Sequence, residues 1–309
     1  MTTAELALES PTRRAGEDVF AWTVFPVAMF GSIGLAIAML NAGANPLLAF
    51  ALPLLLGYAI VIAGERLYPH VADWSRNHGD VRTDAAWAAS IIATGQLMGP
   101  AVGLAAIALG GWLSSRLGSP LWPGDWHLAA QLALALVVVE FFQYWVHRLQ
   151  HETDIMWRFH ATHHSAPRLY WLNAARFHVV DIAINNLAVT IPLIALGAGA
   201  NVIALWILAV TIHGICQHAN MKIRCGPLNW IFSMAELHRW HHTRRESNAN
   251  YGQTLILWDI LFGTRFLPSD RKPPADIGID NLDAFPMTWW AQMLSPFRWS
   301  RIVAESAGH

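Results

Sequence analysis

The stretch Glu140–His164, EFFQYWVHRLQHETDIMWRFHATHH, decides the fold. It begins inside an apolar run long enough to cross a bilayer, and charged residues and five histidines follow. These histidines stand at spacings of i, i+4 and then i, i+3, i+4, as His147, His151, His160, His163 and His164. Residues at such spacings share one face of a helix, so each set is predicted to point in one direction. Two such faces, brought together, would make a metal site.

The composition is typical of a membrane protein. Of the 309 residues, 54% are hydrophobic and 13% are charged. Apolar segments that could enter a hydrocarbon core of about 30 Å cover residues 20–40, 47–63, 85–113, 128–146, 179–198 and 202–215. The last two are short and joined by GAGAN, which predicts a hairpin that dips into the membrane. We therefore expect an all-α, multi-pass membrane helical bundle with about four long transmembrane helices and a shorter helical hairpin.

The positive charges predict the orientation in the membrane. Six crossings would place alternate loops on opposite sides, and of the 20 Lys and Arg residues all but Arg116 then fall on one side. The positive-inside rule assigns that side to the cytoplasm. The histidine-rich segments lie on the same side, although histidine was not used in the assignment. The first apolar run has no clear cleavage site after it, which predicts an uncleaved first membrane helix.

Four regions follow from this pattern. We expect a cytoplasmic N-terminal segment at 1–19, transmembrane helices within 20–146, and a catalytic region at 147–266 that includes the hairpin at about 179–215. A cytoplasmic tail covers 267–309. The catalytic region is predicted to form a cytoplasmic helical cap that carries the histidine boxes.

Charge and cysteine content exclude some functions. The formal net charge is −1 and the basic residues form no dense run, so nucleic acid is not an expected partner. Cys216 and Cys225 lack the spacing of a CxxC motif, and Cys216 lies in an apolar segment. Buried, reduced thiols are the better interpretation of both cysteines.

A second histidine cluster, ELHRWHH, contains His238, His241 and His242. Adjacent residues on a helix diverge by about 100°, so the neighbours in each HxxHH pattern can face two different ions. Imidazole suits iron, zinc, copper and nickel, and it does not choose among them. A structural zinc site closes with four ligands, whereas eight box histidines favour a dinuclear centre. Haem is disfavoured because it needs axial histidines with room for a macrocycle.

The histidine motifs resemble those of a known family. YWVHRLQH, FHATHHS and ELHRWHH, followed by NANYGQTLILWDILFGT, are similar to the fatty acid hydroxylase and sterol desaturase superfamily of integral-membrane di-iron enzymes, over roughly residues 140–266. The resemblance implies that the core metal ligands are His147, His151, His160, His163, His164, His238, His241 and His242. It also places His178 of ARFH and His218 of QHAN near the site, although Val179 stands where the family often has proline. His213, a lone polar group in an apolar helix, is either a ligand or a partner that faces the bundle.

Two carboxylates join His178 as candidate catalytic residues. Glu140 stands seven residues before His147, on nearly the same helical face, and a carboxylate at membrane depth needs a partner. It could orient the other ring nitrogen of a ligand, or it could bind a polar residue of a neighbouring helix. Asp181, three residues after His178, and Asp259 have the same alternatives, with a helix cap or an ion pair to arginine as the second.

The resemblance also implies the chemistry. Two reduced iron ions would bind O2 and generate an oxidant that removes hydrogen from an unactivated C–H bond of a lipid, such as a sterol or a fatty acyl chain. Rebound gives an alcohol and loss of a second hydrogen gives an alkene, so a hydroxylase is the leading hypothesis and a desaturase its nearest alternative. Zinc could replace iron in a purified or crystallised form.

Electrons must come from another protein. The sequence contains no GxGxxG element, haem-attachment motif or iron–sulfur cysteine set, so a separate donor of ferredoxin or cytochrome type, with its reductase, is expected to dock on the cytoplasmic face. A different class of function is a non-catalytic membrane protein that binds zinc or transports metal. A transporter would place its polar residues near mid-membrane, whereas the box histidines are predicted to lie beyond helix ends.

Overall fold

The computed structural model describes residues 11–118 and 121–308. In that part of the chain the residues form helices and loops, and the only β pairing is two isolated bridges. The helices of the long apolar segments are α1 (Pro11–Pro26), α2 (Ser32–Asn41), α3 (Pro46–Leu67), α4 (Val81–Leu117), α5 (Leu128–Glu152), α7 (Val179–Leu196) and α8 (Ala200–His218). The other α-helices are α6 (Asp154–His164), α9 (Ala235–His241), α10 (Leu257–Phe262), α11 (Trp289–Leu294) and α12 (Trp299–Ala307).

Within residues 11–118 and 121–308, six helical segments are long and apolar enough to span a membrane. The first is the unit α1–α2, over Gly16–Asn41, which continues through a π-helical turn directly after Pro26, where the missing N–H of proline disrupts the regular bonding. The others are α3, α4, α5, α7 and α8. The predicted all-helical membrane bundle is confirmed. Its division into four spans and a shorter hairpin is not, because α7 and α8, 18 and 19 residues long, meet the same criterion.

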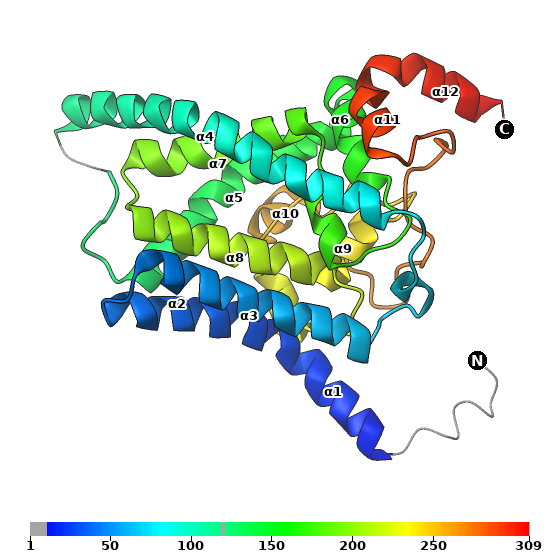
Figure 1. The fold of residues 1–309 in the computed structure, drawn as a ribbon, viewed down its shortest axis with the longest axis horizontal. Helices are drawn as coiled ribbons and strands as arrows, with labels where there is room; N and C mark the ends of the chain where they lie inside the picture. Colours follow the sequence, from blue (N-terminus) through cyan, green and yellow to red (C-terminus); the bar gives the residue numbers. More distant parts are fainter. Residues whose placement is uncertain (1–10, 119–120, 309) are drawn as a thin grey trace.

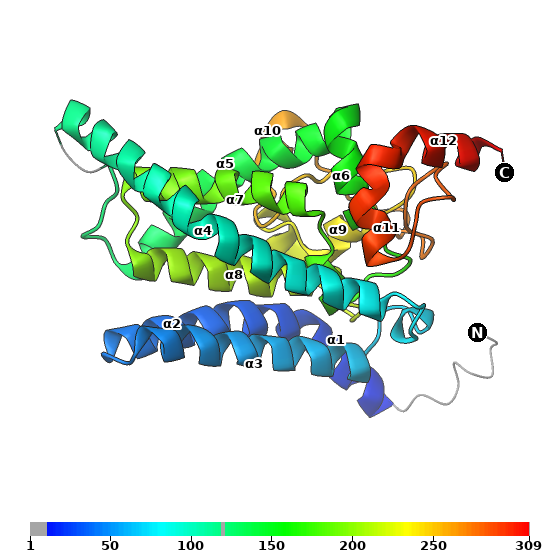
Figure 2. The same cartoon turned by 45° about the horizontal axis from the view of Figure 1, so that its top comes forward.

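The spans pack in layers around α8. Figures 1 and 2 show α2 and α3 side by side on one side of α8, with α4, α5 and α7 on the other. In the most apolar window of α8, 56% of the residues are buried, against at most 39% in any other span. The outer helices instead expose large apolar side chains such as Leu97 and Leu104, which suits contact with lipid. Helix α8 is therefore the centre of the bundle.

Glycines allow the close approaches in this packing. Gly197 ends α7 in the left-handed conformation with φ of 96°, and the amide of Ala198 then donates to Leu193 O in a Schellman turn that leads into α8. Gly110 of α4 lies so close to α7 that an added Cβ would be 2.9 Å from Ala195 O. A side chain at position 110 would force these two helices apart.

Four of the remaining helices lie at one end of the bundle. Figure 1 shows α6, α9, α11 and α12 at the end where α8 finishes and α4 begins, and the segment after α8 packs there with them. Residues 1–10 of the expected N-terminal segment lie outside the described residues, and the rest of it is helical from Pro11 onward. Both cysteines are free and buried, as predicted.

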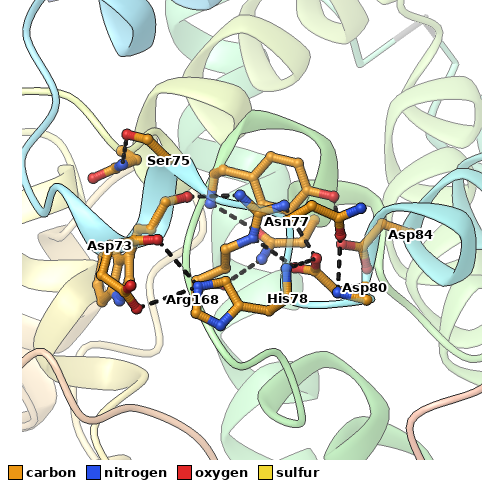
Figure 3. A network of polar contacts seen from close by, with 12 residues as sticks. Asp73, Ser75, Asn77, His78, Asp80, Asp84 and Arg168 are labelled. Carbon is orange, nitrogen blue, oxygen red and sulfur yellow. Dashed lines mark hydrogen bonds and ion pairs between the residues drawn. The ribbon is translucent and has the colours of Figure 1, made fainter.

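Two buried ion pairs tie the loop between α6 and α7 to the start of α4. Arg168 donates to both carboxylate oxygens of Asp80, at 2.7 and 3.1 Å (Figure 3). Arg176 donates to Asp84 Oδ1 at 2.5 Å, and the hydroxyl of Tyr170 donates to Oδ2 of the same carboxylate at 2.7 Å. Acidic residues at a helix N-terminus are favoured by the helix dipole, which suits Asp80 and Asp84 at the start of α4. The loop 165–178 is therefore a fixed part of the bundle.

We expect Asp84→Ala to destabilise the protein strongly. Arg176 and Asp84 are both fully buried, so the variant leaves an uncompensated buried charge, which costs about 3–5 kcal/mol. Thermal unfolding of the detergent-solubilised protein measures the effect. Arg301→Ala, which removes an exposed pair with Glu305, is the control and should change the midpoint little. Equal midpoints for the two variants would contradict this account.

Candidate metal centre

Nine histidines converge in two groups at the end of the bundle. Within each group, one ring nitrogen from every residue lies within 4.8 Å of those of the other members. The first group is His147, His151, His160, His164 and His241, and the second group is His163, His218, His238 and His242. All eight box histidines and His218 are included. Every ligand in both groups is an imidazole, a type of donor that suits iron, zinc, copper and nickel.

Helix geometry sends adjacent histidines to different groups. His163 and His164 end α6, while His241 ends α9 and His242 is the C-cap residue that follows it. In each doublet, one residue joins the first group and its neighbour joins the second. The two groups are therefore neighbours, with the rings of His164 and His242 stacked at 4.5 Å between centroids. A break after Glu152 separates α5 from α6, which lets two short rows of histidines face each other.

Oxygen atoms orient three rings of the first group. Nδ1–H of His147 donates to Tyr251 O at 2.7 Å, and Nδ1–H of His241 donates to Ala249 O at 2.7 Å. His160 Nδ1 donates to Asp181 Oδ2 at 2.9 Å, and this carboxylate is buried. A histidine that donates from Nδ1 keeps a lone pair on Nε2, so these bonds fix the tautomer that binds metal.

The second group is oriented by the loop 165–178. His163 Nδ1 donates to Arg176 O at 3.2 Å, and His218 Nδ1 donates to Asn173 Oδ1 at 2.9 Å. The side chain of Asn173 also donates to Arg168 O, and Arg168 is the residue that binds Asp80. The two ion pairs at the start of α4 therefore hold the oxygens that set two histidine tautomers.

Other ring nitrogens are buried without a partner. Among the described residues, both nitrogens of His164 and Nδ1 of His238 and His242 have none. A buried polar atom left unpaired costs about 1–3 kcal/mol, a cost that a bound cation would remove. The Nε2 atoms of His238 and His218 lie 2.9 Å apart, and those of His242 and His238 lie 3.0 Å apart. The residues present therefore fit a pair of metal ions held by imidazole nitrogens.

Burial keeps the three histidines of α6 and the three histidines of the ELHRWHH motif neutral. It lowers the pKa of each of them well below the usual value of 6.5, and the charge of neighbouring histidines adds to the effect in His160, His163, His164, His238, His241 and His242. An imidazole binds metal only in its neutral form. The site is therefore prepared for cations at physiological pH.

The three carboxylates considered in the sequence have different partners. Asp181 bonds a histidine ring, as described above. Glu140 instead accepts hydrogen bonds from the backbone amides of Gln253 at 2.5 Å and Thr254 at 2.9 Å. Asp259 accepts from the amides of Tyr251 and Gly252, both at 2.7 Å. Glu140 and Asp259 thus hold the loop 251–254, whose carbonyl at Tyr251 orients His147.

His178 and His213 lie outside both groups. His178 Nδ1 accepts from the amide of Val180 and caps α7, while its Nε2 donates to Met293 O at 3.1 Å. His213 is fully buried between aromatic rings, with ring centroids at 5.8 Å from Phe25 and 6.1 Å from Phe232. The structure therefore brings nine of the ten candidate metal ligands together and leaves His213 in the bundle.

Sequence reasoning missed the oxygens that orient the rings. Asn173 belongs to none of the histidine motifs, and the carbonyls of Ala249, Tyr251 and Arg176 come from the backbone, which exists at every position. Gln150, whose amide donates to Asp181 Oδ1, was also missed. A signal for Gln150 was present, because it stands three residues after His147 on a helix face that is already polar.

Two cavities adjoin the histidines. The smaller, about 50 Å³, is lined by His147, His160, His163, His218 and His238 together with several amide side chains. The larger, about 550 Å³, is mostly apolar and lies among residues of α3, α4, α7 and α8. The two share the lining residues Gln143, Ala174, Phe177, Asn185, Gly214 and Gln253. An apolar space inside the membrane-spanning part thus leads to the histidine groups.

Known proteins are similar to this chain in sequence. An ornithine lipid hydroxylase of Rhizobium tropici is 40% identical over 245 residues, which cover 77% of this chain and 72% of that protein. An alkylglycerol monooxygenase of Xenopus tropicalis is 32% identical over 168 residues, covering 52% of this chain and 35% of that protein. Methylsterol monooxygenase 1 of Rattus norvegicus is 27% identical over 142 residues, 45% of this chain and 48% of that protein. No solved structure matches the chain.

The shared region coincides with the metal centre. The model of the fatty acid hydroxylase family matches residues 132–264, which contain all nine histidines of the two groups. The chain spans only about a third of the alkylglycerol monooxygenase, but it covers 72% of the ornithine lipid hydroxylase at 40% identity. With its helical membrane bundle and its converging histidines, the chain is an oxidoreductase that belongs to the fatty acid hydroxylase family.

Proposed function

We propose that the protein is a membrane-bound, non-haem di-iron oxygenase that hydroxylates an unactivated C–H bond of a lipid, using O2 and external electrons. The observation that carries the proposal is the pair of histidine groups beside an apolar cavity in the membrane-spanning part. The relatives are named as lipid hydroxylases and monooxygenases, which supports the same class of reaction. The sterol, the fatty acyl chain and related lipids are the candidate substrates.

The residues of this chain would hold the ions and keep the site dry. Two irons bound by the two groups would supply the O2-derived oxidant for the C–H bond. Asp181 and the loop carbonyls keep the ring nitrogens aimed inward. Phe177 stacks on His163 at 4.2 Å between ring centroids, on the side that faces the cavity. An apolar wall here excludes water, which protects reactive species from side reactions.

The histidine groups and the cavity beside them also bear on two alternatives, desaturation and a structural zinc site. Desaturation would use the same centre and differ in the fate of the substrate, so it stays the nearest alternative. A structural zinc protein needs four ligands and a closed site, whereas here five of the nine histidines line a cavity that reaches three members of the second group. We also propose that the site faces the cytoplasm, on the basis of the charge asymmetry, and that a separate ferredoxin- or cytochrome-type donor supplies electrons there.

The first experiment tests the reaction. Cells that express the protein are grown under ¹⁸O2, and their lipids are compared by mass spectrometry with those of cells that express His163→Ala. We expect one lipid to gain a labelled hydroxyl group only with the parent protein. A desaturase would remove two hydrogens and add no label. Full activity of a preparation that contains zinc alone would refute the iron oxygenase.

Neighbouring histidines should affect different ions. His164→Ala removes a ligand of the first group and His163→Ala removes one of the second, so each should lower the iron bound per protein by roughly half. Mass spectrometry of the purified variants measures the metal. His127→Ala, at the exposed opposite end of α5, is the control and should bind as much iron as the parent. Retention of all iron by both site variants would contradict the assignment.

Asp181→Asn should weaken metal binding without unfolding the protein. The amide keeps the size of the side chain but loses the charge that accepts the proton of His160 Nδ1, and loss of such a partner typically costs 10–100-fold in metal affinity. Chelator competition measures the affinity. Asp276→Asn is the control, because Asp276 lies in an exposed ion pair with Arg244. Equal metal affinity of Asp181→Asn and Asp276→Asn would contradict this role of Asp181.

A further inference from the structure

One amide side chain, that of Gln143, lies at the junction of the two cavities and makes no hydrogen bond to the described part of the protein. Gln143 is 4% exposed and lines both the small cavity at the histidines and the large apolar cavity. In the part of the chain that the structure describes, its carboxamide has no hydrogen-bond partner. Its amide atoms are not among the fully enclosed, unpaired polar atoms of the described residues, so they are accessible from the cavities that Gln143 lines. A hydrogen-bonding group of a ligand in the cavity can therefore pair with this amide.

The other four amide side chains around the small cavity are hydrogen-bonded or exposed. Gln150 and Asn185 both donate to Asp181, and Gln217 donates to Ser233 O. Gln253 is exposed, so water can satisfy its side chain. Only Gln143 among these five is buried, faces both cavities and is unpartnered within the described residues.

The large cavity has the shape expected for an alkyl chain. Along α8 its lining runs from Ile203 to Ile215, which is about 18 Å at 1.5 Å per residue. Its wall is mainly aliphatic and aromatic, and two of its residues, Ile92 of α4 and Ile207 of α8, are 67% and 41% exposed. Both lie within membrane-spanning helices, so the cavity opens toward the hydrocarbon of the bilayer. A chain from a lipid can enter there without crossing water.

We propose that Gln143 positions the substrate: its carboxamide binds a hydrogen-bonding group of a lipid, such as an amide, ester or hydroxyl, whose alkyl chain fills the large cavity. Gln143 stands one helical turn, about 6 Å along the axis, before His147 of the first group. The oxidised carbon therefore lies within a few bonds of that polar group, and the far end of the chain points away from the histidines. That the bound lipid is also the substrate rests on the proposed function, whereas its binding at Gln143 does not.

The test uses two probes of equal chain length, hexadecanamide and hexadecane. Binding is measured by scintillation proximity with tritiated hexadecanamide, in competition with either unlabelled probe, on the purified protein without reductant so that no turnover occurs. The parent should bind the amide at least tenfold more tightly than the alkane, since one hydrogen bond in a dry site contributes about 1.4 kcal/mol. Gln143→Met, which keeps the length of the side chain, should lose this preference. Gln96→Met, the same substitution at an exposed position of α4 that lines neither cavity, should keep it.

Thermal unfolding without a probe separates binding from structure. If the Gln143 amide has no partner in the protein, Gln143→Met should unfold at the same temperature as the parent or higher. A lower midpoint, equal losses for both probes, or a preference that survives in Gln143→Met would overturn the assignment. Hydroxylation plays no part in these measurements. A protein that prefers the amide probe but yields no oxidised lipid would therefore refute the proposed function and leave the role of Gln143 in binding intact.

Discussion

The structure depends on holding nine largely buried imidazoles so that they are aimed at two points. Each ring has two nitrogens, and a ring that is free to rotate or change tautomer would offer its lone pair in the wrong direction. The protein fixes five of them by giving Nδ1–H an oxygen acceptor: Asp181, Asn173, and the carbonyls of Tyr251, Ala249 and Arg176. The remaining helices and loops can be understood by how they hold these oxygens in place.

Most of the acceptors lie on loops, which would be mobile if left to themselves. Buried carboxylates of neighbouring helices hold these loops in place. Asp80 and Asp84 bind the arginines of the loop 165–178, and Glu65 accepts from the backbone amides of Trp171 and Asn220, both at 2.8 Å. The loop 251–254 is held in the same way from α5 and α10. Burying a carboxylate is unfavourable on its own, and the hydrogen bonds to backbone amides and guanidinium groups offset that cost.

The sequence was sufficient for features that depend on local spacing. Apolar runs predicted the spans, and the i, i+3, i+4 pattern predicted that adjacent histidines would diverge toward two points, as those of α6 and α9 do. It was insufficient wherever the partner is distant in the chain. The spacing of Glu140 from His147 suggested a shared role, yet Glu140 binds amides 113 and 114 residues away. Asp181 was noted for its distance from His178, whereas its ring partner is His160, 21 residues away.

The region that matches the family model contains the histidine groups but only part of the wall of the large cavity. Residues 132–264, which match the fatty acid hydroxylase family, contain both histidine groups and the oxygens that orient them. Part of the wall of the large cavity lies outside that region, in Tyr58 of α3 and in Ala88, Ile91 and Ile92 of α4. The start of α4 also supplies Asp84, which holds the loop that orients His163. Helix α4 therefore couples the shape of the cavity to the geometry of the histidine groups, so a substitution in α4 that reshapes the cavity has to preserve the first turn of the helix.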